Sequence, residues 1–337
     1  MLHTPKARPE LPESIAVVMP AFNEAAHIRE AMRAVPAWVD AIYVVDDASA
    51  DDTSEVARAV GDPRAHVLRH EANRGVGGAM VTGYRAALAD GHTIVVKMDA
   101  DGQMPADEMD RLVQPVVANI ADYTKGNRFR LPRSTAGMPS SRKLGSVLLS
   151  FLTKVASGYW HVFDSQCGFT AIRASFLALL DLDNVASDYF FENDMLIKLN
   201  PLSARVVDVP TSTLYGAEVS AISIPKIVAT FPPRLFSRWI ARLSNKYLVI
   251  DFGAVGVLAA GAIVCLLFGS VFGGYHWFLS ATTNHVATTG TVMIAVLPII
   301  IGIQMLLQAF AMEVLSSPGS SETRAYIREL VVSGDLS

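Results

Sequence analysis

The chain of 337 residues is 51% hydrophobic, and its formal net charge at pH 7 is −4. A mean hydropathy of +0.33 is too high for an ordinary soluble enzyme, so part of the chain is expected in a membrane. The slightly acidic balance argues against nucleic acid as a main partner, because binding to a phosphate backbone needs a large basic surface.

The N-terminal residues and the cysteines indicate the compartment. Residues 1–13 hold three prolines and no apolar stretch, which predicts a flexible N-terminus and neither a signal peptide nor a helix. Cys167 and Cys265 lie far apart in the sequence and support neither a disulfide framework nor a zinc cluster. The domain that follows is therefore expected in a reducing, cytoplasmic compartment.

Residues 14–220 show apolar runs that alternate with helical patterns. Ser14–Met19 and Ala41–Val45 predict strands, and each is followed by the pattern of a short helix. Further strands are predicted near residues 65–68, 93–98, 122–126, 170–173 and 204–209. This alternation predicts an α/β domain on a parallel sheet with right-handed crossovers, which is a nucleotide-binding architecture.

The acidic stretch Asp99-Ala100-Asp101-Gly102-Gln103 follows the predicted strand at residues 93–98. It places three oxygen donors on alternate residues at the carboxyl end of a strand, where parallel α/β sheets bind their ligands. Hard oxygen ligands suit Mg²⁺ or Mn²⁺, and a metal there would meet a diphosphate. Taken alone, two acids after a strand more often form a solvated turn or a helix cap.

A glycine-rich stretch at residues 73–79 precedes a helix predicted to end at Ala89. It could cradle a phosphate, but it lacks the ending of a P-loop and the glycine spacing of a dinucleotide site. The favoured alternative is a tight turn that allows close packing between the helix and the sheet.

Five cationic side chains fall within sixteen residues after the acidic stretch: Arg128, Arg130, Arg133, Arg142 and Lys143. They could hold an anionic acceptor through charge-assisted hydrogen bonds, or they could line a solvated loop. The next apolar pattern, Leu144–Val155, has helical spacing. It is expected to pack in the core, and contact with a lipid chain is the alternative.

The character of the chain changes near residue 234. Four cations recur every fourth residue and form one stripe along a predicted helix: Arg234, Arg238, Arg242 and Lys246. A basic stripe beside an apolar face suits an amphipathic helix in the headgroup region, and a helix packed on the domain is the alternative. Residues 221–250 are therefore predicted to be juxtamembrane helices.

Two apolar runs, near residues 252–272 and 291–315, are each long enough to span a bilayer, and the first of them carries no charge. The connecting stretch lacks Lys and Arg, whereas cations flank both spans, so the positive-inside bias places both termini in the cytoplasm. A membrane part over 251–316 and a cytoplasmic tail over 317–337 are predicted. Gln304 and Gln308 need partners within the bilayer, either in the first span or at an oligomer interface.

The motifs together resemble the family 2 glycosyltransferases of GT-A fold, most closely the polyprenyl-phosphate glycosyltransferases of the dolichol-phosphate mannose synthase type. The resemblance covers Ile15–Val209. It rests on the order and spacing of the motifs at residues 20–24, 45–53, 73–75, 99–103, 126–129 and 164–169.

The resemblance implies roles for particular side chains. Four would line the pocket for the base and ribose: Pro20, Phe22, Glu24 and Asp47. Asp99 would lie beside the ribose and the sugar, and Asp101 and Gln103 would hold Mg²⁺ or Mn²⁺ on the diphosphate. Arg128, Arg142 and Lys143 would engage the acceptor phosphate. Gly102, Met104 and Ala48 depart from the usual motifs and weaken the assignment of the donor.

The implied reaction is an inverting transfer of a hexose from a nucleotide diphosphate sugar, of the UDP-glucose or GDP-mannose type, to a polyprenyl phosphate at the cytoplasmic membrane face. A phosphate monoester is largely anionic at neutral pH, so this nucleophile needs no strong general base. Asp164 and Asp194 could orient or contact the acceptor. Neither is expected to be an obligatory base.

Two other functions fit parts of the pattern. A processive polysaccharide synthase often carries Gln-x-x-Arg-Trp in its interfacial helix, and Leu235–Trp239 has the Arg-Trp but lacks the Gln. Two spans are also few for a translocation pore. A non-catalytic sugar-nucleotide sensor or scaffold at the membrane is the second alternative, and the intact carboxylates argue against it.

Overall fold

The computed structural model describes residues 13–130, 140–212, 224–250, 253–283 and 286–333. The chain divides into two compact units. The first runs to Trp239 and resumes at Pro318, and the second is Ile240–Ser317.

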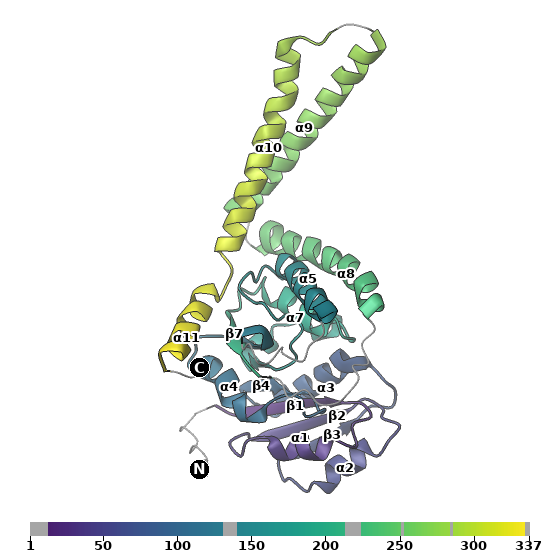
Figure 1. Ribbon diagram of the computed structural model, residues 1–337, viewed down its shortest axis with the longest axis vertical. Coiled ribbons are helices and arrows are strands. Elements are labelled where there is room, and N and C mark those ends of the chain that lie inside the picture. The colour runs from purple at the N-terminus through teal and green to yellow at the C-terminus, as the bar shows by residue number, and fades with distance from the viewer. Residues whose placement is uncertain (1–12, 131–139, 213–223, 251–252, 284–285, 334–337) are drawn as a thin grey trace. The chain divides into compact units, whose positions relative to one another are not determined.

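The first unit is built on a seven-stranded sheet with the order β3-β2-β1-β4-β6-β5-β7 (Figure 1). Its strands are β1 (Ile15–Ala21), β2 (Ala41–Asp46), β3 (Ala65–Arg69), β4 (Ile94–Lys97), β5 (Tyr123–Asn127), β6 (Thr170–Arg173) and β7 (Val206–Pro210). Six strands run in one direction, and β6 is antiparallel to both β4 and β5. The prediction of a wholly parallel sheet is therefore wrong at β6. Because β6 enters from the opposite edge, the residues before it lie at the carboxyl ends of the other strands.

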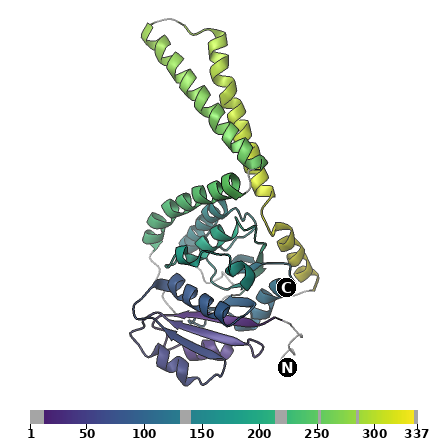
Figure 2. The same ribbon diagram turned by 180° about the vertical axis from the view of Figure 1, so that it is seen from behind.

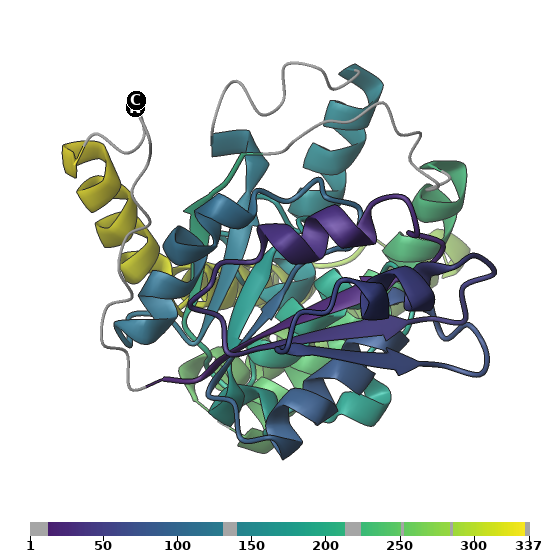
Figure 3. The same cartoon turned by 90° about the horizontal axis from the view of Figure 1, so that it is seen from below.

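Helices cover both faces of the sheet (Figure 3). One face packs against α1 (Ile28–Ala34), α2 (Thr53–Ala59), α4 (Met109–Val117) and α11 (Ser320–Ser333), and the other against α3 (Gly75–Ala89), α6 (Ala174–Leu177) and α7 (Phe191–Leu199). Successive strand residues point to opposite faces, so Val17 lies in the first core and Val18 in the second. Both residues are fully buried. The sheet is thus the middle layer of three.

A third apolar cluster joins α7 to α5 (Ser140–Ser157) and α8 (Ile224–Ser244). Leu149 and Leu152 of α5 pack against it, which confirms the predicted core role of this helix. The same helix exposes Leu148 and Phe151. Short 3₁₀ turns complete the unit: η1 (Ala106–Glu108), η2 (Arg128–Arg130) and η4 (Leu182–Asn184).

Helix α11 covers the edge strand β7. Thr323 Oγ1 lies 3.4 Å from the Val206 carbonyl and 3.3 Å from the Asp208 amide, and the Tyr326 hydroxyl donates to the Arg111 carbonyl at 3.0 Å. The interpretation of residues 317–337 as a tail is therefore wrong for 320–333. An edge strand has unpaired backbone groups, and a covering helix protects them.

The second unit holds η5 (Asn245–Ile250), a π-helical turn, and the helices α9 (Ala254–Thr283) and α10 (Thr289–Leu315), which lie side by side (Figure 2). Both helices are apolar and long enough to cross a membrane. The first continues eleven residues past its predicted end near residue 272. A Cβ on Gly302 would lie 3.1 Å from the Ala262 carbonyl, so this glycine permits close helix contact.

Two pairs of polar side chains in the second unit differ in burial. Arg242 and Glu313 form a buried ion pair with Nη2 and Oε1 2.5 Å apart. Gln304 and Gln308 are exposed on α10, so packing against the first span does not cover them. An oligomer interface stays the prediction for these two amides.

Candidate active site

The candidate residues gather at one edge of the sheet. The carboxyl ends of β1, β2, β4 and β5 lie there, together with the residues that enter β6. Ligands of α/β sheets bind at this edge, because the loops after the strands converge there.

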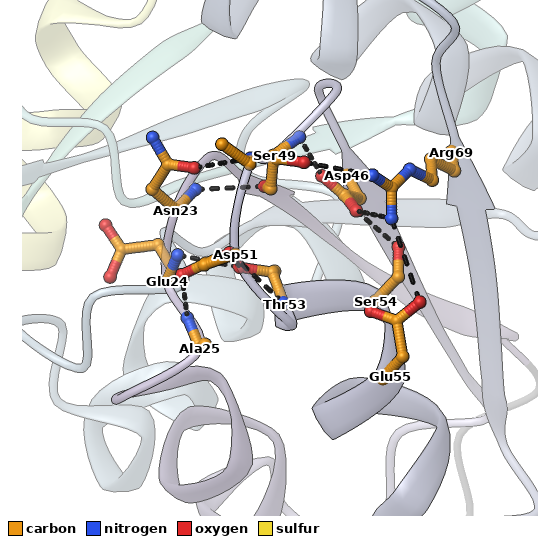
Figure 4. Close-up of polar contacts among 11 residues, drawn as sticks. Asn23, Glu24, Ala25, Asp46, Ser49, Asp51, Thr53, Ser54, Glu55 and Arg69 are labelled. Atoms are coloured by element: carbon orange, nitrogen blue, oxygen red, sulfur yellow. Dashed lines mark hydrogen bonds and ion pairs between the residues drawn. The ribbon is translucent and has the colours of Figure 1, made fainter.

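The loops after β1 and β2 are held together by hydrogen bonds between their residues (Figure 4). The amide of Asn23, which has a φ of 58°, donates to Ser49 Oγ at 2.9 Å, and the amide of Glu24 donates to Thr53 Oγ1 at 2.9 Å. These bonds fix the loop that carries Phe22, whose side chain is 48% exposed. An exposed aromatic ring on a fixed loop can stack on a planar base.

Asp46, at the end of β2, also holds these loops in place. Its carboxylate accepts from the Ser49 amide at 2.8 Å and from the Ser54 hydroxyl, and Arg69 Nη1 lies 3.5 Å away. Burial would raise the pKa of Asp46, but the hydrogen bonds from Ser49 and Ser54 hold it below its usual value. Asp46 is therefore an ionised structural support.

Asp47 and Pro20 are both buried. Asp47 Oδ1 accepts from His70 Nδ1 at 2.7 Å and from the Arg74 amide at 2.8 Å, and its Oδ2 accepts from the Gly75 amide at 2.7 Å. Among the four residues predicted for the base and ribose pocket, Phe22 and Glu24 reach the surface. Asp47 holds the glycine-rich turn, and Pro20 lies inside β1.

The glycine-rich turn packs against residues 186–188. The amides of Gly77 and Gly78 donate to the Ser187 carbonyl at 2.7 and 3.2 Å, and a Cβ on Gly77 would lie 2.0 Å from the Ala186 carbonyl. Because these amides are already bonded, they do not cradle a phosphate. The interpretation as a turn with close packing is confirmed. The turn packs against the segment before α7 as well as against the sheet.

Asp99, Asp101 and Gln103 lie on the loop that follows β4, and all three side chains are partly exposed. Asp101 Oδ1 accepts from the Gln103 amide at 2.9 Å, which fixes the turn. Within the described residues, no three His, Cys, Asp or Glu side chains gather into a metal site. Mg²⁺ commonly takes one or two carboxylates and completes its shell with substrate phosphates and water, so these oxygen donors fit a metal shared with a diphosphate.

Lys97 at the end of β4 was not among the predicted site residues. Its Nζ is buried and lies 2.7 Å from Asp99 Oδ1 and 3.1 Å from Glu192 Oε1. Burial would lower the pKa of Lys97, but these two carboxylates raise it, so the ammonium stays charged. A lysine within a buried strand is the sequence signal that points to this pair.

Gly168 brings the loop before β6 onto this ion pair. A Cβ added to Gly168 would lie 2.4 Å from Lys97 Nζ and 2.8 Å from Asp99 Oδ2. A side chain at this position would therefore displace the pair.

We expect Gly168→Ala to weaken binding of the nucleotide sugar that the resemblance implies about tenfold, in line with the 1–3 kcal/mol cost of overpacking. Isothermal titration with the donor measures this effect. Gly145→Ala is the matched control, because an added Cβ there meets nothing within 4 Å. Equal affinity in the Gly168 variant and the control would show that the close approach has no bearing on the donor.

Arg128 and Asp164 form a two-point ion pair at the end of β5. Arg128 Nε lies 2.7 Å from Asp164 Oδ2, and Nη2 lies 3.0 Å from Oδ1. Asp164 is buried, whereas the Arg128 side chain is 19% exposed. Asp164 therefore orients Arg128.

Arg130, on the same 3₁₀ turn, pairs with Asp208. Its Nε lies 3.1 Å from Asp208 Oδ2, which also accepts from Asn127 Nδ2 at 2.6 Å. Burial raises the pKa of Asp208 to about 6, although Arg130 and Asn127 act in the opposite direction.

This raised pKa predicts a pH-dependent contribution to stability. The folded chain binds the proton on Asp208 more tightly than the unfolded chain, whose pKa is about 4. The contribution is fully present below pH 4 and is lost as the pH rises through about 6. Lowering the pH from 7.5 to 5 should raise the free energy of unfolding by about 1.4 kcal/mol through this group.

Denaturation of the full chain and of Asp208→Asn at both pH values measures this contribution, because other groups titrate equally in both proteins. The rise in the free energy of unfolding between pH 7.5 and pH 5 should be about 1.4 kcal/mol smaller in Asp208→Asn than in the unchanged chain. Parallel pH profiles of the two proteins would contradict the assignment.

The basic stripe of α8 pairs with acids of the chain. Arg234 Nη1 lies 2.7 Å from Asp188 Oδ2, and Arg238 Nε lies 3.0 Å from Asp194 Oδ1. Arg242 pairs with Glu313. These three arginines therefore have carboxylate partners within the chain, and contact of this helix with lipid headgroups stays a prediction.

Asp194 is fully buried in α7, and its Oδ2 also accepts from the Ala186 amide at 2.9 Å. Burial raises the pKa of Asp194, and Arg238 acts against this shift. A buried and paired carboxylate supports the segment before α7. The side chains of Arg142 and Lys143, and all of Arg133, lie outside the described parts of the chain.

The sequence matches the family described as Glycosyl transferase family 2 over residues 16–185. The chain is 31% identical to the UDP-N-acetylglucosamine–dolichyl-phosphate N-acetylglucosaminyltransferase of Methanococcus voltae, covering 60% of this chain and 86% of that protein. It is 37% identical to the undecaprenyl-phosphate mannosyltransferase of Micrococcus luteus, covering 50% of this chain and 70% of that protein.

Among solved structures, the fold is similar to that of glucosyl-3-phosphoglycerate synthase from Mycobacterium tuberculosis in complex with Mn²⁺, UDP and glucosyl-3-phosphoglycerate. The TM-score is 0.51 at 21% identity, covering 68% of this chain and 80% of that one. The sheet with its carboxylate loop thus has the GT-A fold. The chain belongs to glycosyl transferase family 2.

Proposed function

We propose that this enzyme transfers a hexose from a nucleotide diphosphate sugar to a polyprenyl phosphate at the cytoplasmic face of a membrane, with inversion at the anomeric carbon. The observation that carries the proposal is that residues 164–168 touch both halves of the site. Asp164 binds Arg128, and Gly168 lies against Lys97 and Asp99. A sugar donor bound at Asp99 and an anionic acceptor bound at Arg128 would therefore lie close to each other, next to residues 164–168.

The donor side is the surface formed by Phe22, Glu24, Asp99, Asp101 and Gln103. The exposed ring of Phe22 would stack on the base, and Asp99 would accept hydrogen bonds from ribose or sugar hydroxyls. Asp101 and Gln103 would hold Mg²⁺ or Mn²⁺. When bound, the metal would neutralise charge that grows on the leaving diphosphate.

The acceptor side is Arg128, with Arg142 and Lys143 proposed beside it. The acceptor phosphate of the relatives named for dolichyl phosphate and undecaprenyl phosphate is a dianion near neutral pH, with a second pKa near 6. Arg128 would hold one phosphate oxygen so that another attacks the anomeric carbon. Because no proton must leave the attacking oxygen, the site needs no general base.

The membrane placement rests on α9 and α10. The residues up to Trp239, before these two helices, and the residues from Pro318 onward, after them, both belong to the first unit. Because the chain before and after these two helices belongs to the catalytic domain, α9 would cross the bilayer in one direction and α10 in the other. Both termini would then lie on the same side of the membrane. The first unit would thus meet a lipid-anchored phosphate at the membrane surface.

A donor panel tests the proposal. The full chain in lipid nanodiscs is incubated with Mn²⁺, undecaprenyl phosphate and, separately, radiolabelled UDP-glucose, UDP-N-acetylglucosamine and GDP-mannose. Labelled lipid from one donor is the expected product. Labelled polymer would indicate a processive synthase, and nucleotide binding without any labelled product would indicate a sensor or scaffold.

We expect Asp194→Asn to slow the chemical step far less than loss of a metal ligand does, because the carboxylate is fully buried and pairs with Arg238. Single-turnover assays at saturating lipid measure the step, with Asp101→Ala as the comparison. Equal losses in the two variants would identify Asp194 as an obligatory base.

A further inference from the structure

We propose that Lys125 is a positioning residue for the transfer reaction. By binding the Cys167 carbonyl, it fixes residues 164–168, which touch both the donor side and the acceptor side of the site. This inference rests on the proposed function, and it assigns a role to a residue outside the motifs on which the family resemblance rests.

Lys125 lies in β5, and its side chain is fully buried. Its Nζ donates to the Cys167 carbonyl at 2.6 Å, and no carboxylate of the described residues forms an ion pair with it. Burial lowers the pKa of Lys125, although the charges of Glu192 and Asp164 act against this shift. A buried amine without an ionic partner costs stability, so this hydrogen bond indicates a role in function rather than in folding.

Three residues of β5 and the start of η2 bind the segment before β6: Lys125, Gly126 and Arg128. Arg128 pairs with Asp164, and the Gly126 amide donates to the Phe169 carbonyl at 2.9 Å. Lys125 binds the peptide group between these two contacts, at the Cys167 carbonyl. The segment is therefore held at its start, near its end and just beyond its end.

The peptide group that Lys125 binds leads directly into Gly168, the residue that lies against the donor side. An added Cβ on Gly168 would collide with Lys97 Nζ and would lie 2.8 Å from Asp99 Oδ2, so the segment packs closely on this ion pair. A rotation of the Cys167–Gly168 peptide group would therefore move the segment against the pair or away from it. The hydrogen bond from Lys125 opposes this rotation and would so fix the donor relative to the acceptor.

Lys125→Met tests this role, because it removes the hydrogen-bond donor and keeps an unbranched side chain in the buried space. We expect kcat of the full chain in nanodiscs to fall about 100-fold, since a misplacement of about 1 Å between reacting groups can cost this much. The KM values of the nucleotide sugar and of undecaprenyl phosphate should stay within about threefold, because the residues proposed to bind them are unchanged. An unchanged kcat would overturn the proposal, whether or not KM changed.

The midpoint of thermal unfolding separates positioning from a structural role. It should stay the same or rise in Lys125→Met, because an apolar side chain in place of a buried ionisable group is often neutral or stabilising. A fall in kcat that came with a fall in the midpoint of more than about 5 °C would show that Lys125 supports the fold, and it would contradict the inference.

Thr124→Val is the matched control. Thr124 precedes Lys125 in β5 and is fully buried, and its Oγ1 donates to the Leu112 carbonyl at 2.8 Å. Because successive strand residues point to opposite faces, this variant removes a similar hydrogen bond from the same strand on the other face of the sheet. It should keep its kcat. Equal losses of kcat in the two variants would mean that any weakening of β5 slows transfer, and the specific role of Lys125 would be refuted.

Hydrogen exchange tests the segment without any sugar transfer. The Cys167 amide donates to the Asp164 carbonyl at 3.3 Å, so its exchange reports opening of this turn. Peptides that cover residues 164–169 should exchange about five- to tenfold faster in Lys125→Met than in Thr124→Val or the unchanged chain. Equal exchange in all three proteins would overturn the inference about Lys125. Failure of the unchanged chain to form labelled lipid from any donor would instead contradict the proposed function.

Discussion

Replacing Asp101 by Asn should lower the rate of sugar transfer about 1,000-fold and should abolish Mn²⁺ binding in the presence of the nucleotide. The Asp101 carboxylate lies on the loop after β4, is partly exposed, and accepts a hydrogen bond from the Gln103 amide. Losing a charge-stabilising contact to the transition state typically costs ~10²–10³ in rate, and loss of the metal removes several kcal/mol of stabilisation. Steady-state assays with the donor identified by the panel measure the rate.

Asp107→Asn is the matched control for this variant. Asp107 lies six residues further along the chain in η1 and is exposed. The control should keep its rate and its Mn²⁺ affinity. A variant at Asp101 that retains Mn²⁺ binding while losing activity would show that another residue holds the metal.

Replacing Arg128 by Lys should lower kcat/KM for the lipid acceptor about 100-fold or more and should leave the affinity for the nucleotide sugar within threefold. Lysine keeps the charge but cannot make the two-point contact that Arg128 makes with Asp164 through Nε and Nη2. Breaking one partner of a buried charge pair costs about 2–5 kcal/mol. Transfer assays across a range of undecaprenyl phosphate concentrations, together with donor titrations, separate the two effects.

Arg130→Lys is a suitable control, because Arg130 lies on the same 3₁₀ turn and pairs with another buried carboxylate, that of Asp208. It breaks an equivalent ion pair two residues away. If both variants lost the same acceptor efficiency, the effect would come from the turn and not from contact between Arg128 and the acceptor phosphate.

Residues close in sequence made the class of the protein predictable. The alternation of strands and helices predicted the α/β domain, and two long apolar runs predicted α9 and α10. The short motifs, such as Asp99–Gln103, identified the glycosyltransferase family. These features are readable because apolar periodicity and motif spacing act within a few residues.

Contacts between distant residues were not predictable in the same way. The antiparallel entry of β6 places Gly168 against Lys97, and no local pattern reveals the direction of a four-residue strand. The pairing of Arg238 with Asp194 likewise joins residues 44 positions apart. The sequence showed a basic stripe, but it could not show which carboxylates neutralise it.

The sequence by itself therefore determined the family and the order of the elements, and it supplied the residues that are proposed for metal and phosphate binding. Only the tertiary structure decided their partners: Asp47 holds a turn, Asp164 orients Arg128, and Lys97 binds Asp99. The physical reason is that electrostatic interactions depend on distance and burial. Both quantities arise only when strands and loops from different parts of the chain meet at one edge of the sheet.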